Sequence, residues 1–228
     1  MRLATVNVTE EGRRSIMNVL SPSGTNKVAK TCYASSARQM APTSLSIKVP
    51  GTPSCNVCMG QRFAGIAPTD TASLAKLRVA AMTLGNSFTG KLMKIVRDEN
   101  GLTYGIGARV VSNGSFPSLV VNATFNKDVL QRGREMTMGL LSDFCNGKFS
   151  SDEISVAKES LKHQRDTYGC SSGFLNKMAQ KAMLDPVPLN FAEYWRNIEE
   201  CSHEDIQQLV RKSLKPNGFS VAAAGTLS

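Results

Sequence analysis

Histidine, aromatic residues and long apolar runs are all scarce in this sequence, and each shortage excludes a class of protein. The two histidines, His163 and His203, lie outside any H-E-x-x-H or H-x-x-E-H motif, so the chain lacks the sequence pattern of a catalytic zinc site. Aromatic residues make up 6% of the chain and no RNA-binding stacking motif occurs, which argues against nucleic-acid binding. No run reaches about 18 apolar residues, so no transmembrane helix is expected.

Cysteines in metal-binding spacing are also few. The chain has six cysteines, and only Cys55 and Cys58 form a C-x-x-C pair. A structural zinc site needs about four ligands, commonly from two such pairs. In a strand, moreover, these two side chains would point to opposite faces. We therefore expect structural cysteines in a reduced, intracellular protein, rather than a metal site or a disulfide framework.

The charge balance is basic, and the length suits one domain. Lys and Arg number 27 against 18 Asp and Glu, a net charge of +9. Because the basic residues are scattered, the simplest interpretation is a solvated surface with a basic bias. An acidic partner, or a compartment rich in basic proteins such as the mitochondrial matrix, fits the charge equally well. We expect a single domain over residues 1–228.

The hydrophobic pattern predicts strands and helices in blocks rather than in strict alternation. Thr69 or Asp70 is expected to cap the helix that follows it, and Asn113-Gly114 is a hairpin turn. The strand at 54–64 is expected to pair with the strand at 44–49. This order indicates an α+β fold with an antiparallel sheet. Strands are expected at residues 3–8, 44–49, 54–64, 102–112, 116–125 and 219–224, and helices at 10–20, 71–85, 88–100, 127–146, 151–169, 173–184, 191–200 and 203–214.

The stretch RDENGLTYGIG combines a fixed cation and a phenol in one short connection. Arg97 falls in the last turn of a predicted helix that ends at Gly101, and Tyr104 begins a strand. One interpretation is structural: Arg97 caps the helix end and Tyr104 packs at a sheet edge. Gly105 and Gly107 favour another, because glycine inside a strand often marks the close approach of a second backbone. A bound peptide could supply that backbone, with Arg holding a carbonyl or carboxylate and Tyr donating to an oxyanion.

The longer stretch LGNSFTGKLMKIVRDENGLTYGIGARV resembles the second, non-zinc half of the pitrilysin/insulinase family, the inverted-zinc metallopeptidases that include the mitochondrial processing peptidases. The similarity runs from about Leu45 to the C-terminus, and the first 40 residues match only loosely. It implies a two-layer half-domain of the processing-peptidase or LuxS-like type, with an antiparallel sheet and helices on one face. By resemblance, Arg97 and Tyr104 would bind the substrate backbone near the scissile bond, and Tyr104 would help to stabilise the tetrahedral intermediate. Gly101 and Leu102 would shape the turn that presents them.

The resemblance also implies partners. A zinc-bearing homologous half or subunit would face this chain across a closed chamber, and the catalytic zinc would belong to that half, with no cofactor bound here. The chain alone would be inactive, and it would be either a short subunit or a fragment of a longer chain. Two alternatives stay open: a non-catalytic scaffold like the core proteins of respiratory cytochrome bc complexes, and a stand-alone peptide-binding module. The mitochondrial location of some members of this family, together with the basic charge, suggests a mitochondrial, or otherwise intracellular, location.

Overall fold

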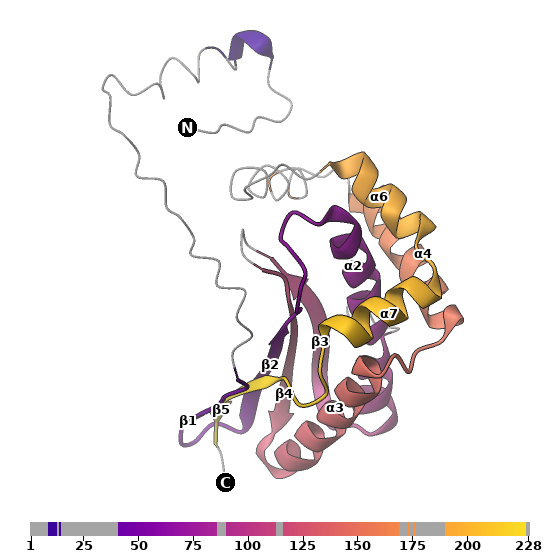
Figure 1. Ribbon diagram of the computed structural model, residues 1–228. Coiled ribbons are helices and arrows are strands. Elements are labelled where there is room, and N and C mark those ends of the chain that lie inside the picture. The colour runs from indigo at the N-terminus through magenta and orange to yellow at the C-terminus, as the bar shows by residue number, and fades with distance from the viewer. Residues whose placement is uncertain are drawn as a thin grey trace.

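The computed structural model describes residues 9–12, 14, 41–85, 90–112, 116–168, 173, 176 and 190–226. These residues form two layers, a twisted sheet with helices on one face (Figure 1). The strands are β1 (Ser44–Lys48), β2 (Ser54–Arg62), β3 (Thr103–Val111), β4 (Ser118–Asn126) and β5 (Ser220–Gly225). The helices are α2 (Thr71–Gly85), the π-helix η1 (Met93–Glu99), the 3₁₀-helix η2 (Lys127–Val129), α3 (Leu130–Cys145), α4 (Ser151–Tyr168), α6 (Phe191–Glu200) and α7 (His203–Ser213).

The sheet has the strand order β1-β5-β2-β4-β3. β2 is antiparallel to both β4 and β5, and β3 is antiparallel to β4, whereas β1 runs parallel to β5. The predicted α+β class is therefore confirmed, with one parallel pair in the sheet. The predicted pairing of the first two strands is wrong, because β5 from the end of the chain lies between them. Periodicity within a strand defines its faces but not its neighbour, so it could not have placed β5.

Strict alternation along the central strands builds the core. On β4, Leu119, Val121, Ala123 and Phe125 are buried, at most 6% exposed, while the residues that alternate with them face the other way. On β2, Cys55 is buried and Cys58 is exposed, which confirms that the two cysteines point to opposite faces. The inward face is the one that the helices cover, so a single hydrophobic core lies between the two layers.

Helix α2 is the centre of the helical layer. It contacts β3 on one side and α4, α6 and α7 on others, so most of its residues are buried. It begins where the sequence indicated, because the Ser73 backbone N–H donates to Asp70 Oδ1 at 3.0 Å. Asp70 is thus the N-terminal cap of α2. It is one of the two residues, Thr69 and Asp70, that the sequence predicted for this role.

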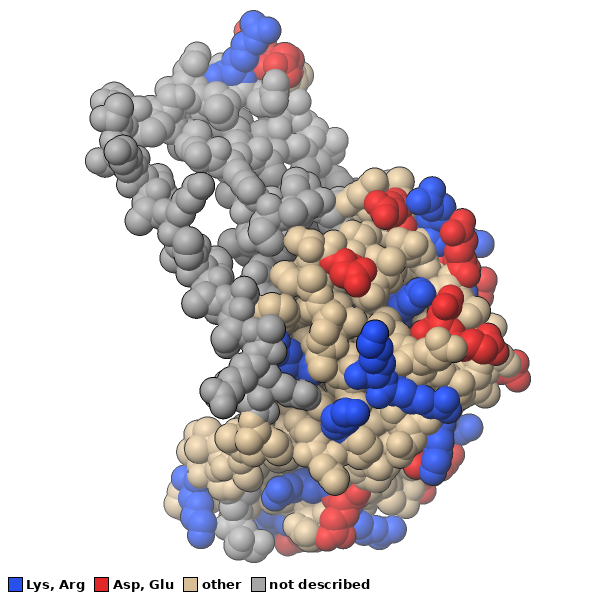
Figure 2. All heavy atoms as spheres, viewed as in Figure 1, with Lys and Arg blue, Asp and Glu red and all other residues tan. Residues whose placement is uncertain are grey.

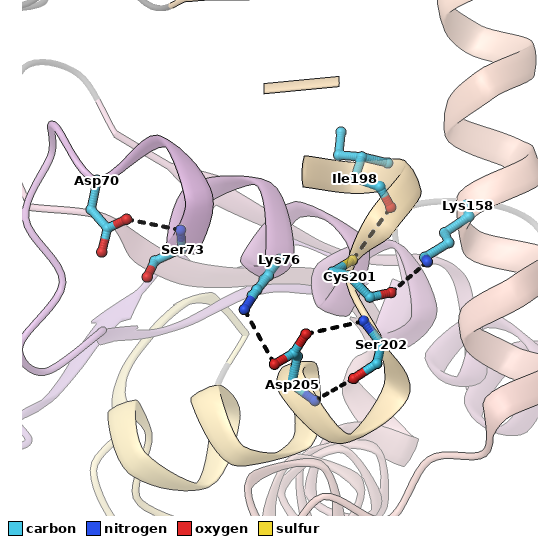
Figure 3. A network of polar contacts seen from close by, with 8 residues as sticks. All are labelled: Asp70, Ser73, Lys76, Lys158, Ile198, Cys201, Ser202 and Asp205. Carbon is cyan, nitrogen blue, oxygen red and sulfur yellow. Dashed lines mark hydrogen bonds and ion pairs between the residues drawn. The ribbon is translucent and has the colours of Figure 1, made fainter. Parts of the chain in front are cut away.

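A polar network fixes α7 against α2 and α4 (Figure 3). Ser202 and Asp205 form a capping box, with the Asp205 N–H donating to Ser202 Oγ and the Ser202 N–H to Asp205 Oδ2. Lys76 of α2 lies 3.4 Å from Asp205 Oδ1. Lys158 of α4 donates to the carbonyl oxygens of Glu199 and Cys201 at the end of α6. Three helices are therefore joined at the start of α7.

Several predicted elements lie outside the described residues: the strand at 3–8, most of the helices at 10–20 and 173–184, and the Asn113-Gly114 turn. The strands on either side of that turn, β3 and β4, do pair as an antiparallel hairpin would. Of the helices in the described ranges, none combines the length and the apolar character that a membrane span requires.

Candidate functional site

Arg97 lies in the last turn of η1, as predicted, but that helix is not an ordinary α-helix. Its hydrogen bonding is π-helical from Met93 to Glu99. Single π-helical turns are rare and occur often at functional sites, because the extra residue rotates the side chains that follow it. Val96, which is fully buried, anchors the turn in the core next to Arg97.

Gly101 closes the helix in the left-handed region, with φ at +62°. Its N–H donates to the Arg97 carbonyl oxygen at 2.8 Å, and the Leu102 N–H donates to the Val96 carbonyl oxygen at 3.0 Å. Leu102 is 4% exposed, so its side chain holds the turn against the core. A residue with a Cβ would be strained at Gly101. These two residues therefore bring the chain out of η1 and into β3 along one defined path.

The Asn100 side chain fixes the same turn from outside. Its Nδ2 donates to the Ile95 carbonyl oxygen at 2.9 Å, and its Oδ1 accepts from Arg132 Nη2 of α3 at 3.4 Å. Sequence reasoning did not single out Asn100, because an asparagine before Gly101 looks like any helix end. Its bond to Ile95 becomes visible only in three dimensions.

The guanidinium of Arg97 is accessible. The side chain is 39% exposed, and its Nη1 lies 3.8 Å from Oδ1 of the neighbouring Asp98. An exposed ion pair at that separation contributes little, about 0–1 kcal/mol. Arg97 can therefore turn its planar fork to a carbonyl or carboxylate without losing a strong internal partner.

Tyr104 is 87% exposed, although it lies in a strand. In the ladder between β3 and β4, Thr103 faces Phe125 and Gly105 faces Thr124, so Tyr104 is an extra residue at a β-bulge. A bulge redirects a side chain and is common beside functional sites. The structural interpretation, in which this ring packs at a sheet edge, fails on that exposure. The phenol instead stands clear of the surface formed by the described residues.

The two glycines after Tyr104 have different explanations. A Cβ on Gly107 would lie 3.1 Å from the Gly85 carbonyl oxygen at the end of α2. The backbone that approaches Gly107 therefore belongs to this chain, which corrects the expectation of a peptide there. A Cβ on Gly105 would meet nothing within 4 Å. The space above Gly105 is open, next to Tyr104.

The outer face of the sheet, away from the helices, has a hollow of about 450 Å³ that reaches Gly105. At its far end, Leu45 and Ile47 of β1 are 59% and 52% exposed. Asn56 and Thr124 lie in the same hollow and are joined by a hydrogen bond of 2.8 Å from Thr124 Oγ1 to Asn56 Oδ1. The sequence of any one strand does not predict this hollow, because it forms only where the strands lie side by side.

Charge and metal-binding groups give no stronger candidate. On the face shown in Figure 2, basic side chains are spread from the lower to the upper edge with acidic ones among them. Within the part of the chain that the structure describes, no group of three His, Cys, Asp or Glu side chains could hold a metal ion. The turn with Arg97, Gly101, Leu102 and Tyr104 is thus the best candidate site, and its groups can bind a peptide backbone and donate hydrogen bonds.

Comparison with known proteins gives a family for this arrangement. A family model described as the peptidase M16 inactive domain matches residues 21–161. No curated protein matches the sequence. The M16 peptidases are the pitrilysin/insulinase family that the sequence resembles.

Solved structures share the fold at low sequence identity. A protease from Helicobacter pylori is 14% identical with a TM-score of 0.79, over 98% of this chain and 53% of that one. A peptidase M16 inactive domain from Pseudomonas fluorescens is 17% identical with a TM-score of 0.70, over 84% and 45%. A chain of complex III2 from Candida albicans, with Inz-5 bound, is 15% identical with a TM-score of 0.67, over 81% and 46%. This chain thus spans about half the length of these structures.

Proposed function

Because the chain belongs to the M16 peptidase family and matches its inactive domain, we propose that it is the substrate-binding half of a zinc metalloendopeptidase. In this proposal a homologous half that carries H-x-x-E-H faces it, holds the catalytic zinc and supplies the metal-activated water. The present chain holds the peptide. It has no catalytic activity of its own.

The observation that carries the proposal is the accessibility of two hydrogen-bond donors on one rigid turn. Arg97 is 39% exposed at the end of η1, and Tyr104 is 87% exposed at the bulge of β3. Six residues lie between them, and one of these, Leu102, is buried. With 87% of its surface exposed, the Tyr104 ring leaves its hydroxyl accessible to a bound peptide.

Each residue has a distinct chemical task. The Arg97 guanidinium donates to a substrate carbonyl and orients the chain near the bond to be cleaved. The Tyr104 hydroxyl donates to the oxygen that becomes negative in the tetrahedral intermediate, where a preorganised donor is worth the most. The open space above Gly105 lets a peptide backbone pass close to the strand.

The first measurement is purification of the protein with whatever binds it in its source, followed by mass spectrometry and metal analysis. We expect a chain with H-x-x-E-H, fused or separate, and about one zinc ion per complex. If the protein is recovered without any partner, or within an assembly that contains no zinc, the peptidase role is excluded.

The residue test uses that complex with a peptide substrate. Tyr104→Phe should lower kcat/KM by about 100-fold, the usual effect of losing an oxyanion donor. Arg97→Ala should lower it by roughly 10–100-fold, because it removes a charged hydrogen bond to the substrate carbonyl. Zinc content and the midpoint of thermal unfolding should stay at their wild-type values. Arg109→Ala is the matched control, since Arg109 is an exposed arginine on the same strand. An effect below about threefold in both variants would contradict the role.

The similarity to a chain of complex III2 favours one second candidate, a non-catalytic scaffold in a larger assembly such as a mitochondrial complex. A scaffold needs the fold but has no use for an exposed Arg97 and Tyr104. Under this candidate, the two variants would assemble normally and change no measured activity. The identity of the co-purified partners separates it from the peptidase role.

A further inference from the structure

We propose that Thr103 is a positioning residue, and that its buried hydroxyl locks the bulge that aims Tyr104. The inference rests on the proposed function, since it extends the role of Tyr104 to its neighbour. Thr103 itself is 9% exposed and touches no substrate. It acts through the backbone.

The hydroxyl bridges the two strands where their register shifts. Thr103 Oγ1 donates to the Thr124 carbonyl oxygen of β4 at 2.6 Å, with the Gly105 carbonyl oxygen as a second acceptor at 3.0 Å. It also accepts from the Gly105 N–H at 3.1 Å. One side chain thus holds the residue after Tyr104 and the strand opposite it.

A lock is needed because the local sequence specifies register weakly. Gly105 and Gly107 follow within three residues of Tyr104, and strands rich in glycine slip more readily than others. Tyr104 cannot hold itself, because its ring is 87% exposed and has little packing to fix its direction. Its position therefore follows the backbone of the bulge.

Losing the hydroxyl has two consequences. The Gly105 N–H and the Thr124 carbonyl lose a partner at the edge of the core, and the bulge becomes free to move by one residue. A shift of one residue would turn Tyr104 to the other face of the sheet. Even a displacement of about 1 Å at a catalytic donor can lower turnover by about 100-fold.

The test compares Thr103→Val with Thr103→Ser in the complex of this chain with its zinc-bearing half. Valine keeps the shape and removes the hydroxyl, whereas serine keeps the hydroxyl. Thr103→Val should lower kcat by at least about tenfold with KM changed less than twofold, and Thr103→Ser should stay within about twofold of wild type. Hydrogen exchange at the Gly105 amide should be at least about tenfold faster in Thr103→Val only.

Thr137→Val is the matched control. Thr137 is fully buried, and its Oγ1 donates to the Gly133 carbonyl oxygen at 2.7 Å inside α3 rather than to the bulge. It should change neither kcat nor exchange at Gly105. If Thr103→Val fails to assemble, Thr103→Ala also removes the hydroxyl and places no second methyl beside the Thr124 carbonyl.

A double-mutant cycle assigns the effect to Tyr104. In a Tyr104→Phe background, Thr103→Val should lower kcat no further, because the donor that it positions is already gone. An equal loss in both backgrounds, or unchanged exchange at Gly105, would overturn the proposal. If Tyr104→Phe alone keeps full turnover, the proposed function fails, and exchange at Gly105 then decides by itself whether the hydroxyl holds the bulge.

Discussion

The pairing of β2 with β4 and the connection from η1 to β3 are built in opposite ways. The central pair runs through nine consecutive residue pairs without a shift in register, and burial alternates along both strands. The connection gathers a π-helix, a glycine at φ +62° and a bulge between Met93 and Gly105. The irregular features thus lie beside Arg97 and Tyr104. In this molecule the regular region carries stability, and the irregular one presents side chains.

The irregular connection persists because the core holds both of its ends. Val96 and Leu102 are buried on either side of Gly101, so the turn cannot relax into a longer helix without exposing them. A left-handed backbone is unfavourable by roughly 1–2 kcal/mol for a residue with a Cβ, and only glycine avoids that strain. Departures from regular structure that are held this firmly are typical of functional sites.

The largest expected effect lies in the regular region, at Leu119. The side chain is fully buried on β4, so Leu119→Ala should lower the free energy of unfolding by about 2–5 kcal/mol. In the assembled peptidase, turnover per folded molecule should stay within about twofold, because the site is built elsewhere. Urea unfolding and peptide cleavage measure the two quantities. The neighbouring Val120→Ala, on the less buried face, is the control, and a selective loss of turnover in Leu119→Ala would break the comparison.

Substitutions of the two glycines of β3 test the comparison most directly, and their expected effects are of intermediate size. Gly107→Ala places a methyl 3.1 Å from the Gly85 carbonyl oxygen and should destabilise the fold by about 1–3 kcal/mol. Gly105→Ala meets nothing within 4 Å and should change stability by less than about 0.5 kcal/mol. In the assembled peptidase, Gly105→Ala should instead raise KM for peptide, because the methyl occupies the space of the bound backbone. If both variants changed the free energy of unfolding equally, the surroundings of Gly105 and Gly107 would not differ as described.

The smallest effect concerns the regular start of α7. The Ser202 N–H, followed by Lys76, holds the pKa of Asp205 below its usual value. Because the folded pKa is the lower one, the stabilisation is present above the unfolded value of about 3.9 and disappears as the pH falls through the folded value. Asp205→Asn should therefore cost less than about 1 kcal/mol at pH 6, and this cost should shrink as the pH falls through the folded pKa of Asp205.

Unfolding at several pH values measures the effect at Asp205. Glu159→Gln, which removes an exposed carboxylate from α4, is the control and should show no such difference. A difference between wild type and Asp205→Asn that grows toward pH 2 would contradict the sign derived from the pKa.

Local sequence patterns were sufficient to predict most of the helices and strands and one helix cap. The strands near 44–49, 116–125 and 219–224 and the helix at 71–85 were predicted within a few residues, because period and flanking turn residues are properties of short segments. Asp70 caps α2 for the same reason. The parallel pairing of β1 with β5 could not be predicted, since it joins residues about 177 positions apart. The π-helical form of η1 also left no periodic signal.

The candidate site divides in the same way. Residue types and spacing, with the family resemblance, singled out Arg97, Gly101, Leu102 and Tyr104. They could not tell Gly105 from Gly107, because both are glycines at alternate positions of one strand. The difference depends on where the end of α2 lies. Thr103 was missed for a similar reason: its importance comes from the Thr124 carbonyl on the next strand.

The sequence by itself therefore determined the faces of each strand and helix, the family, and which side chains are candidates for the site. Those properties depend on residues within a few positions of one another. Only the tertiary structure decided which strands are neighbours, that Tyr104 stands on a bulge, and that one buried hydroxyl lies where it can hold that bulge. These depend on contacts between distant segments, and such contacts exist only once the core has brought the segments together.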